Sequence, residues 1–237
     1  MQTQALILRA GGLKENDRLI TALTKEYGVL TAFANGAQKP KSPLHGATQC
    51  YAHGQLEFIR RRDTYVVTDA KADGVFFTGL AADLSRLALA GYFSALFAEL
   101  SPREEPAPEH LRLGLNALHF LSTGLRPQLL IKAVVEVKLV CLAGYKPDLD
   151  TAGHYLDLER GFMRPEAGPG KVLLPPAVHE AMRFICGGAL ERAFRFALPE
   201  EGLRALSFAS QTYLQYQTGR RFEELDTYDK YIRGNHI

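Results

Sequence analysis

The sequence has no long hydrophobic run, and this absence limits the kind of protein it encodes. The longest mainly apolar stretch without a charged residue covers residues 113–125. That stretch is well short of the roughly 20 residues that cross a bilayer as a helix. The first residues show no cationic segment followed by an apolar block, so nothing in them indicates secretion. We therefore expect a cytoplasmic protein without a membrane contact.

Cysteines are few, odd in number and far apart in the sequence: Cys50, Cys141 and Cys186. Such a set does not suggest a disulfide framework and offers no paired metal spacing. His154, Asp157 and Glu159 come nearest to a ligand cluster, but no second cluster completes a coordination shell. We expect no metal and no other cofactor.

The sequence also lacks the motifs of common catalytic sites. It has no GxxxxGK[ST] phosphate loop, no GxSxG nucleophile elbow and no HExxH zinc motif. Cys50 lies near His45 and His53 in the sequence, but nothing there fixes the geometry of an activated thiol. We therefore expect a protein without enzymatic activity.

Positive charge is concentrated in the first third of the chain. Residues 1–78 hold ten Lys and Arg against seven Asp and Glu, a net charge of +3, while the remainder holds 18 against 19. Between Gly36 and Arg62 there are five bases and one acid, Glu57. A local excess of this kind favours an anionic partner, for which nucleic acid is the commonest candidate.

The first 72 residues read as five short strands. The β-prone runs are residues 5–8, 19–24, 29–34, 56–59 and 65–68, and residues 25–28 form a tight connection between the second and third. Five strands with a long excursion after the third suit a small closed Greek-key barrel, of which the OB-fold is the commonest nucleic-acid-binding version. Strand counting alone leaves an SH3-like barrel open.

From about Thr78 the period of the apolar residues becomes helical. Leu80, Leu84, Leu87 and Gly91 follow 4, 3, 4 spacing, and further helical runs end near Gly124, Gly144 and Gly219. Residues 148–176 interrupt these runs with the pattern of a small β-hairpin. The predicted fold is therefore α+β, with a five-stranded OB-fold barrel over residues 1–77 and a helical bundle over residues 78–237.

Two basic segments, which we expect on adjoining loops of the barrel, together form the candidate DNA-binding site. Lys39 and Lys41 lie in a loop stiffened by prolines, and three arginines occupy the turn between the last two strands. The candidate DNA-binding residues are Arg18, Lys39, Lys41, Arg60, Arg61 and Arg62, and Lys14 and Lys25 could extend the surface. If about four cations neutralise phosphates of a single strand, log K falls with log salt at a slope of roughly −3.

Aromatic residues are interleaved with these bases, at positions Phe33, Tyr51, Phe58 and Tyr65. Each could stack on a base, which is worth about 1–3 kcal/mol. The alternative is that Phe33, Phe58 and Tyr65 fill the core of the barrel.

The order of these motifs resembles the bacterial RecO family of DNA repair and recombination mediators. The residues that carry the resemblance are the run 5–9, the segment 15–24, the turn 25–28 and above all the loop 34–42, which reads Gly-Ala-x-Lys-Pro-x-Ser from Gly36 onward. The similarity continues through residues 132–144, the strand at Phe162 and residues 216–222, so it covers nearly the whole chain.

The resemblance implies an OB-fold joined to a helical domain that binds single- and double-stranded DNA and anneals complementary strands. It also implies work with RecR, and in many bacteria RecF, to displace single-stranded DNA-binding protein and load RecA. The acidic tail of the single-stranded DNA-binding protein would contact the helical domain. From the charge of that tail, and not from the resemblance, we expect a groove edged by Lys132, Arg183 or Arg192. Many members of the family carry a four-cysteine zinc ribbon where this chain has no cysteine in residues 149–153 or 162–166.

Two other interpretations remain open from the sequence. The basic loop of a protein adaptor could dock an acidic peptide without binding DNA. The chain could also be a nucleic-acid enzyme of unrecognised type, with His154 or Asp157 in its active site.

Overall fold

The computed structural model describes residues 1–13 and 15–234, which form two compact units. One unit holds Met1–Thr123 together with the C-terminal segment that starts at Glu223, and the other holds Gly124–Phe222. Within the described residues, no helix combines the length and the hydrophobicity needed to cross a membrane.

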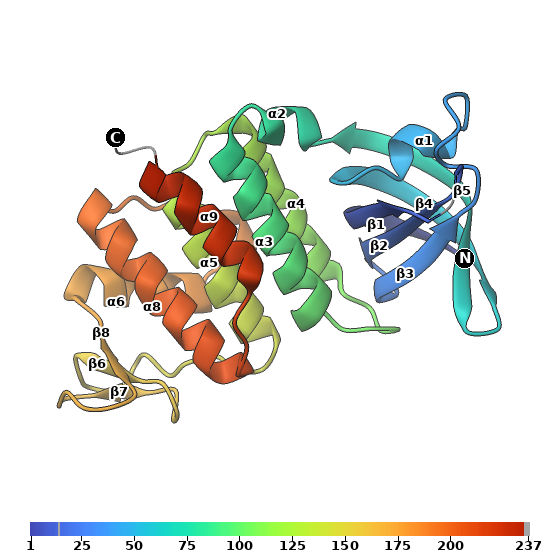
Figure 1. The fold of residues 1–237 in the computed structure, drawn as a ribbon. Helices are drawn as coiled ribbons and strands as arrows, with labels where there is room; N and C mark the ends of the chain where they lie inside the picture. Colours follow the sequence, from blue (N-terminus) through green and yellow to red (C-terminus); the bar gives the residue numbers. More distant parts are fainter. Residues whose placement is uncertain (14, 235–237) are drawn as a thin grey trace. The chain divides into compact units, whose positions relative to one another are not determined.

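A closed five-stranded barrel forms the N-terminal part of the first unit (Figure 1). Its strands are β1 (Gln2–Gly12), β2 (Arg18–Thr24), β3 (Gly28–Ala34), β4 (Ala52–Arg61) and β5 (Thr64–Val75). The strand order is β1-β2-β3-β5-β4, β4 pairs with β1 to close the barrel, and only the β3 and β5 pair is parallel. The short helix α1 (Leu44–Ala47) lies between β3 and β4. This arrangement confirms the OB-fold and removes the SH3-like alternative.

Alternate residues of the strands fill the barrel. Phe58 is fully buried, and the rings of Tyr27 and Tyr65 pack edge-on against it at 5.3 and 5.4 Å. Ala32 and Ala34 belong to the same core, so Phe33 between them points outward. The core prediction was therefore right for Phe58, largely right for Tyr65, and wrong for Phe33.

The strand registers place the two basic segments at opposite ends of the barrel. Thr24 pairs with Gly28 at one end of β2 and β3, and Arg18 pairs with Ala34 at the other. Since β5 runs parallel to β3 and its second residue, Tyr65, pairs with Ala32, the β4–β5 turn that precedes it extends toward the Gly28 end. The loop after Ala34 leaves from the other end (Figure 1). The expectation that Lys39 and Arg60 lie on adjoining loops was wrong, because it ignored strand direction.

Four helices complete the first unit: α2 (Phe77–Ala81), α3 (Leu84–Leu100), α4 (Pro108–Thr123) and α9 (Glu223–Gly234). The carboxylate of Asp83 accepts hydrogen bonds from the amide and hydroxyl of Ser85, at 2.8 and 2.6 Å, and so starts α3 as a new helix. Because of this break, Leu80 and Leu84 belong to different helices and do not share one face. Leu84, which the 4, 3, 4 spacing predicted to face the core, is 58% exposed. The buried face of α3 instead includes Phe93 and Phe97.

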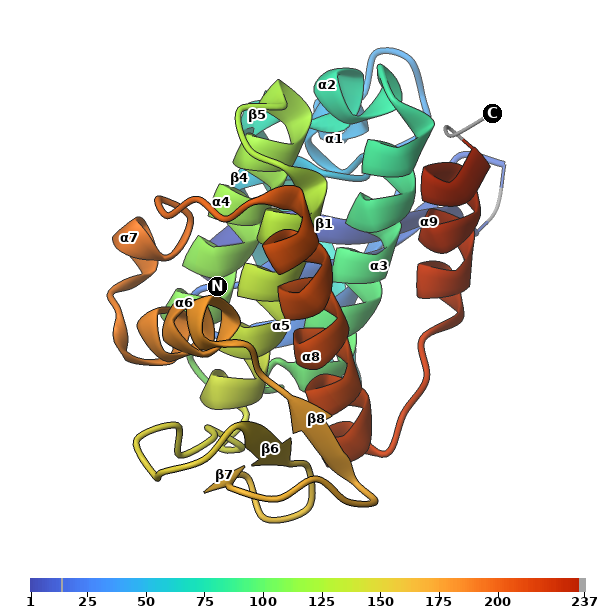
Figure 2. The same cartoon turned by 90° about the vertical axis from the view of Figure 1, so that its left-hand side faces the viewer.

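The second unit holds the remaining helices and a small sheet (Figure 2). Its elements are α5 (Gln128–Leu142), β6 (Tyr155–Asp157), β7 (Met163–Arg164), β8 (Lys171–Leu173), α6 (Pro176–Gly187), α7 (Leu190–Ala193) and α8 (Glu200–Thr218). β6 and β7 form the predicted hairpin, and β8 pairs with the other edge of β6 as a third strand. Gly219, at φ 63°, ends α8 where the sequence predicts it.

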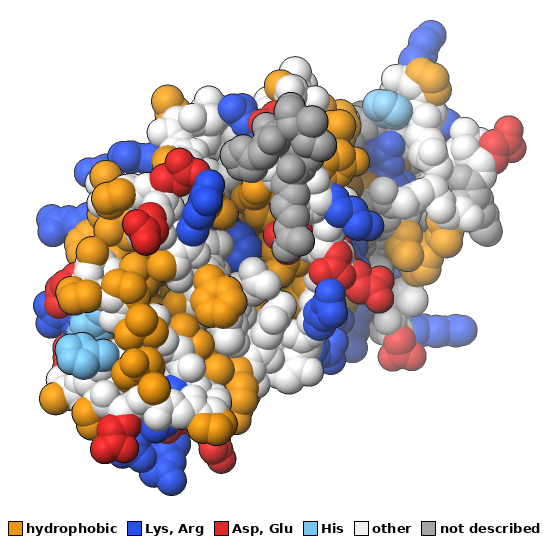
Figure 3. All heavy atoms as spheres, turned by 60° about the vertical axis from the view of Figure 1, so that its left-hand side comes forward, with side chains coloured by type: hydrophobic (Ala, Val, Ile, Leu, Met, Phe, Trp, Pro, Cys, Tyr) orange, Lys and Arg blue, Asp and Glu red, His pale blue; other side chains and the backbone are white. Residues whose placement is uncertain are grey.

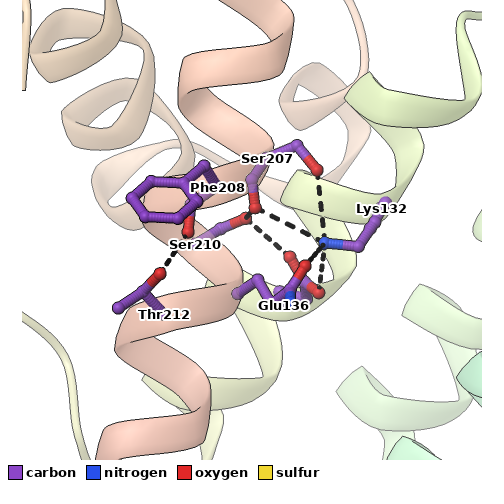
Figure 4. A network of polar contacts seen from close by, with 7 residues as sticks. Lys132, Glu136, Ser207, Phe208, Ser210 and Thr212 are labelled. Carbon is purple, nitrogen blue, oxygen red and sulfur yellow. Dashed lines mark hydrogen bonds and ion pairs between the residues drawn. The ribbon is translucent and has the colours of Figure 1, made fainter. Parts of the chain in front are cut away.

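A buried ion pair within α5 is hydrogen bonded to α8 (Figure 4). The Nζ of Lys132 lies 2.8 Å from Oε1 of Glu136, and both side chains are almost fully buried. The same Nζ donates to the hydroxyl of Ser207 at 3.2 Å, and the hydroxyl of Ser210 donates to Glu136 Oε2 at 2.6 Å. Lys132 therefore edges no surface groove, and its expected contact with an acidic tail was wrong because the hydrophilic side chain has its partners inside the unit.

Candidate nucleic-acid interface

The base of the basic loop is held by the turn between β1 and β2. The carboxylate of Asp17 accepts the amide of Gly36 at 2.8 Å, and the carbonyl of Asp17 accepts the side-chain amide of Gln38 at 2.7 Å. Gly36 has φ 67°, a backbone conformation that glycine adopts without strain. Ala37 is fully buried in the barrel core. The loop therefore starts from a fixed position.

Beyond Gln38 the loop extends into solvent. Two successive turns, closed by Lys39 N to Gly36 O and by Ser42 N to Lys39 O, carry the exposed Lys39 and Lys41. Within the described residues, neither lysine has a carboxylate at ion-pair distance. Both ammonium groups are therefore available to an anion from outside the protein.

Arg18 braces this loop and is only half-exposed. Its Nη1 donates to the carbonyl of His45 and to the hydroxyl of Thr48, each at 3.0 Å. It thereby holds α1 against the start of β2. Among the predicted DNA-binding residues, Arg18 already has two hydrogen-bond acceptors inside the unit. Lys14, which was expected to extend the same surface, lies outside the described residues.

The second basic group lies in the β4–β5 turn. Arg62 has φ 52°, and the hydroxyl of Thr64 donates to the carbonyl of Arg61 at 2.9 Å, which tightens the turn. All three arginines are exposed. The arginine triplet therefore projects from the end of the barrel opposite to Lys39.

The register separates Arg60 from Arg61. Arg60 is opposite Tyr65, and its guanidinium lies 5.7 Å from the centre of that ring and 3.5 Å from a carboxylate oxygen of Glu104. The phenol of Tyr65 also donates to Glu104, at 3.0 Å, and burial together with this bond raises the pKa of Tyr65. Arg61 is opposite Thr64 and shares the side of β4 that carries Ile59. Within the described residues, Arg61 and Arg62 have no carboxylate at ion-pair distance.

A row of apolar side chains crosses the outer face of the barrel between the two basic groups. Leu19 pairs with Phe33, Phe33 with Val66, and Val66 with Ile59, across β2, β3, β5 and β4. All four side chains are partly or largely exposed. We call these four residues the apolar row. It gives the barrel face a surface on which a base can stack, with Phe33 as its aromatic member.

The other aromatic candidates do not reach this face. Phe58 is fully buried and Tyr65 packs on it. Tyr51 is 7% exposed, and burial, assisted by the neighbouring Cys50 sulfur, raises the pKa of Tyr51 to about 12. Of the four aromatics that the sequence suggested, only Phe33 therefore lies in a position to stack on a base.

Sequence reasoning missed Arg9 as a member of this face. A bulge in β1 after Ile7 places Arg9 opposite Thr21, beside the pair that Thr21 makes with Thr31. Its guanidinium lies 3.3 Å from a carboxylate oxygen of Glu224 on α9. The alternation of β1 alone predicts this position poorly, since the bulge shifts the register by one residue.

No metal centre is assembled in the part of the chain that the structure describes. Asp157 instead closes a turn, because its carboxylate accepts the amides of Glu159 and Arg160 at 3.2 and 3.0 Å. The bond from Arg160 is the largest of the influences that lower the pKa of Asp157, and Arg164 at 3.7 Å adds to it. The carboxylate of Asp157 therefore stabilises the turn that follows β6.

Two protein-family models match the chain, one over the barrel strands and one over the helices that follow. Residues 1–75 match the family model described as Recombination protein O N terminal, and residues 81–226 match the one described as Recombination protein O C terminal. A DNA repair protein RecO from Acetivibrio thermocellus is 26% identical over 95% of each chain. One from Dehalococcoides mccartyi strain CBDB1 is 25% identical over 91% of this chain and 89% of its own. One from Heliobacterium modesticaldum is 35% identical over 62% of this chain and 53% of its own.

Proposed function

Because this chain belongs to the RecO family of DNA repair proteins, we propose that it binds and anneals DNA as a recombination mediator, without enzymatic turnover. Residues 1–77 act in this proposal as the nucleic-acid-binding domain. Residues 78–237 act as the helical domain, with 148–176 as its β insertion. The protein works in the cytoplasm, where its DNA substrates lie.

The apolar row between two basic groups is the observation that carries this proposal. A DNA strand that crosses the row in the direction of β5 has Lys39 and Lys41 at one end and Arg61 and Arg62 at the other. At a strand rise of about 3.3 Å per residue, Thr64, where β5 begins after the arginine turn, lies about 7 Å along β5 from Val66. One OB-fold covers roughly 4–16 nucleotides, so a single DNA strand is long enough to reach both basic groups. Phosphates bind the ends and a base stacks on Phe33.

Replacing Phe33 tests this placement. We expect Phe33→Ala to weaken binding of labelled single-stranded DNA by about 5- to 150-fold, the loss of one stacked base. Phe77→Ala is the matched control, since Phe77 is an exposed aromatic of α2 away from the row. Equal affinities for the two variants, with both folded by circular dichroism, would remove Phe33 from the site.

Further partners belong to the same proposal. With RecR, the protein helps load RecA on single-stranded DNA that is coated by single-stranded DNA-binding protein. An RecA-loading assay with and without RecR measures this step. RecA filament formation that is unchanged by the protein would contradict it.

A groove in the second unit suits the tail of the single-stranded DNA-binding protein, which is acidic with an apolar end. The groove, of about 520 Å³, lies between β8 and α8, where Figure 3 shows hydrophobic side chains gathered. Phe208 and Leu173 are 64% and 54% exposed along it, and Lys171 lies at its edge. We expect Phe208→Ala to abolish tail-peptide binding by fluorescence anisotropy, while DNA binding is retained.

The alternative function is a protein adaptor whose basic loop docks an acidic peptide. The exposed Lys39 and Lys41 would serve a peptide carboxylate as well as a phosphate. The apolar row favours DNA, since a peptide on the loop alone would not use Phe33. Acidic-peptide binding that Lys39→Glu abolishes, together with no binding of single-stranded DNA, would favour the adaptor.

A further inference from the structure

A second row of side chains runs beside the apolar row on the outer face of the barrel. On each of β2, β3, β5 and β4 its member lies two residues along the strand from a member of the apolar row, so both rows point to the same side. Neighbouring strands bring these members together, because Arg9 pairs with Thr21, Thr21 with Thr31, and Thr64 with Arg61. Thr31 and Thr64 each directly precede a residue of the parallel pairing between β3 and β5. We call these five residues the polar row.

Arg9 is the end of the polar row on β1. Its side chain is 55% exposed. Two strand spacings, about 10 Å, separate β1 from β3, which carries both Thr31 and the proposed stacking residue Phe33. Threonine hydroxyls and arginines are among the groups that contact DNA phosphates. Arg9 therefore adds a cation on the β1 side of the face that holds the proposed DNA path.

A carboxylate of the C-terminal helix lies against this cation. Nη2 of Arg9 donates to Oε1 of Glu224 at 3.3 Å. Glu224 belongs to the first turn of α9, where the helix N-terminus favours a carboxylate. α9 packs along α3 and buries Leu225 and Tyr228 (Figure 1). The packing of α9 therefore keeps Glu224 opposite Arg9.

The contact between Arg9 and Glu224 can be exchanged for a contact with DNA. Both side chains are exposed, at 55% and 41%, and an ion pair in water contributes little to stability. A phosphate offers the guanidinium two acceptor oxygens at once. Arg60 differs from Arg9, because its guanidinium lies over the ring of Tyr65, on the side of β4 that faces away from the apolar row.

We propose that Arg9 is a further phosphate-binding residue of the barrel face and that Glu224 competes with DNA for it. The inference rests on the proposed DNA binding, and it adds to that site a residue and a means of regulation. The phosphate belongs either to the strand that passes Phe33 or to a strand paired with it. In the wild-type protein the exchange replaces one anion beside Arg9 by another, so it adds little to the salt dependence of binding.

A double-mutant cycle of DNA binding by the full-length protein tests the proposal. Glu224→Gln should raise the affinity for labelled DNA about 1.5- to 5-fold, the range for one exposed ion pair. It should also steepen the salt slope by up to about 0.7 for a single strand or 0.9 for a duplex, because Arg9 now releases a counterion. Arg9→Gln should lower the affinity, and Glu224→Gln should add nothing to the Arg9→Gln variant. A gain with single-stranded DNA assigns the phosphate to that strand, and a gain with the duplex alone assigns it to the second strand.

Glu200→Gln is the matched control. Glu200 is a first-turn carboxylate of α8 in the second unit and forms an exposed ion pair with Arg204, so its substitution removes the same charge and should leave both affinities unchanged. A gain from Glu224→Gln that persists in the Arg9→Gln variant, a gain no larger than that of Glu200→Gln, or no gain with either DNA would overturn the proposal. With wild-type DNA binding intact, such a result removes this inference alone, whereas a wild-type protein that binds no DNA would also overturn the proposed function.

Discussion

Single side chains in this protein are held by partners that the sequence does not reveal. Lys132 reads as a surface base on a helix, yet its ammonium has Glu136, Ser207 and Gln211 as neighbours inside the second unit. Arg18 reads as a DNA-binding cation, yet it holds α1 in place. The charge of a residue in the sequence therefore does not show whether that residue contacts a ligand or stabilises the fold.

The buried ion pair yields a prediction about stability. Lys132→Met leaves the Glu136 carboxylate buried without its cation, which should cost about 3–5 kcal/mol of unfolding free energy in urea. The double variant Lys132→Met and Glu136→Met should recover most of this loss, because both charges are gone. A double variant as unstable as Lys132→Met would show that the pair is not coupled.

Two histidines predict how stability depends on pH. Burial lowers the pKa of His53 and of His110 below that of an unfolded histidine, although Asp73 and Glu109 respectively oppose this. The unfolded chain therefore binds protons first, so stability should be constant above about pH 6.5 and fall as the pH drops below it. Urea midpoints from pH 8 to pH 5 measure the fall, and it should shrink in His53→Leu combined with His110→Leu. An equal fall in that variant would assign it to other groups.

Strands and turns set what each basic group can contact. Arg60 and Arg61 are neighbours in the sequence, but the β4–β5 register turns Arg60 toward Tyr65 and Glu104 and Arg61 toward the apolar row. Because successive side chains of a strand point to opposite sides, Arg60 faces protein partners and Arg61 faces the proposed DNA path.

This difference should appear in the salt dependence of DNA binding. Arg61→Ala should reduce the slope of log K against log salt for single-stranded DNA by about 0.7, the loss of one phosphate contact. Arg60→Ala should leave the slope nearly unchanged, because Glu104 already lies beside that guanidinium. The reverse result would show that the Tyr65 side of the hairpin faces DNA.

The β2–β3 turn depends on one glycine. Gly28 has φ +61°, and an added Cβ would lie 2.0 Å from the carbonyl oxygen of Pro102, which accepts the amide of Val29 at 2.8 Å. Gly28→Ala should therefore cost at least about 3 kcal/mol, from backbone strain and the displaced hydrogen bond. Gly170→Ala is the control, with φ +67° and open space around the added Cβ, and should cost about 1–2 kcal/mol. Equal losses would mean that the Pro102 loop moves aside.

At the scale of the whole molecule, the sequence predicted element types well and spatial neighbours less well. The five strands, the hairpin after Thr24 and the stop at Gly219 follow from local patterns and were found. The break at Asp83 is a local cap bond to Ser85 that the spacing of apolar residues does not show, and the third strand β8 depends on pairing with the separate segment β6. Strand direction is likewise not visible in the sequence, so the two basic groups were expected to lie together. In the structure they lie at opposite ends of the barrel, on either side of the apolar row.

A salt titration of binding to labelled single-stranded DNA tests the central claim most directly. With Lys39, Lys41, Arg61 and Arg62 on phosphates, affinity should fall on the order of 60-fold between 50 and 200 mM salt, a slope of roughly −3. Reversing these four charges to Glu should remove most of the affinity and the slope, while the same change at Arg183, Arg192, Arg195 and Arg204 of the second unit should leave both intact. Unaltered, salt-insensitive binding by the first variant would contradict the account.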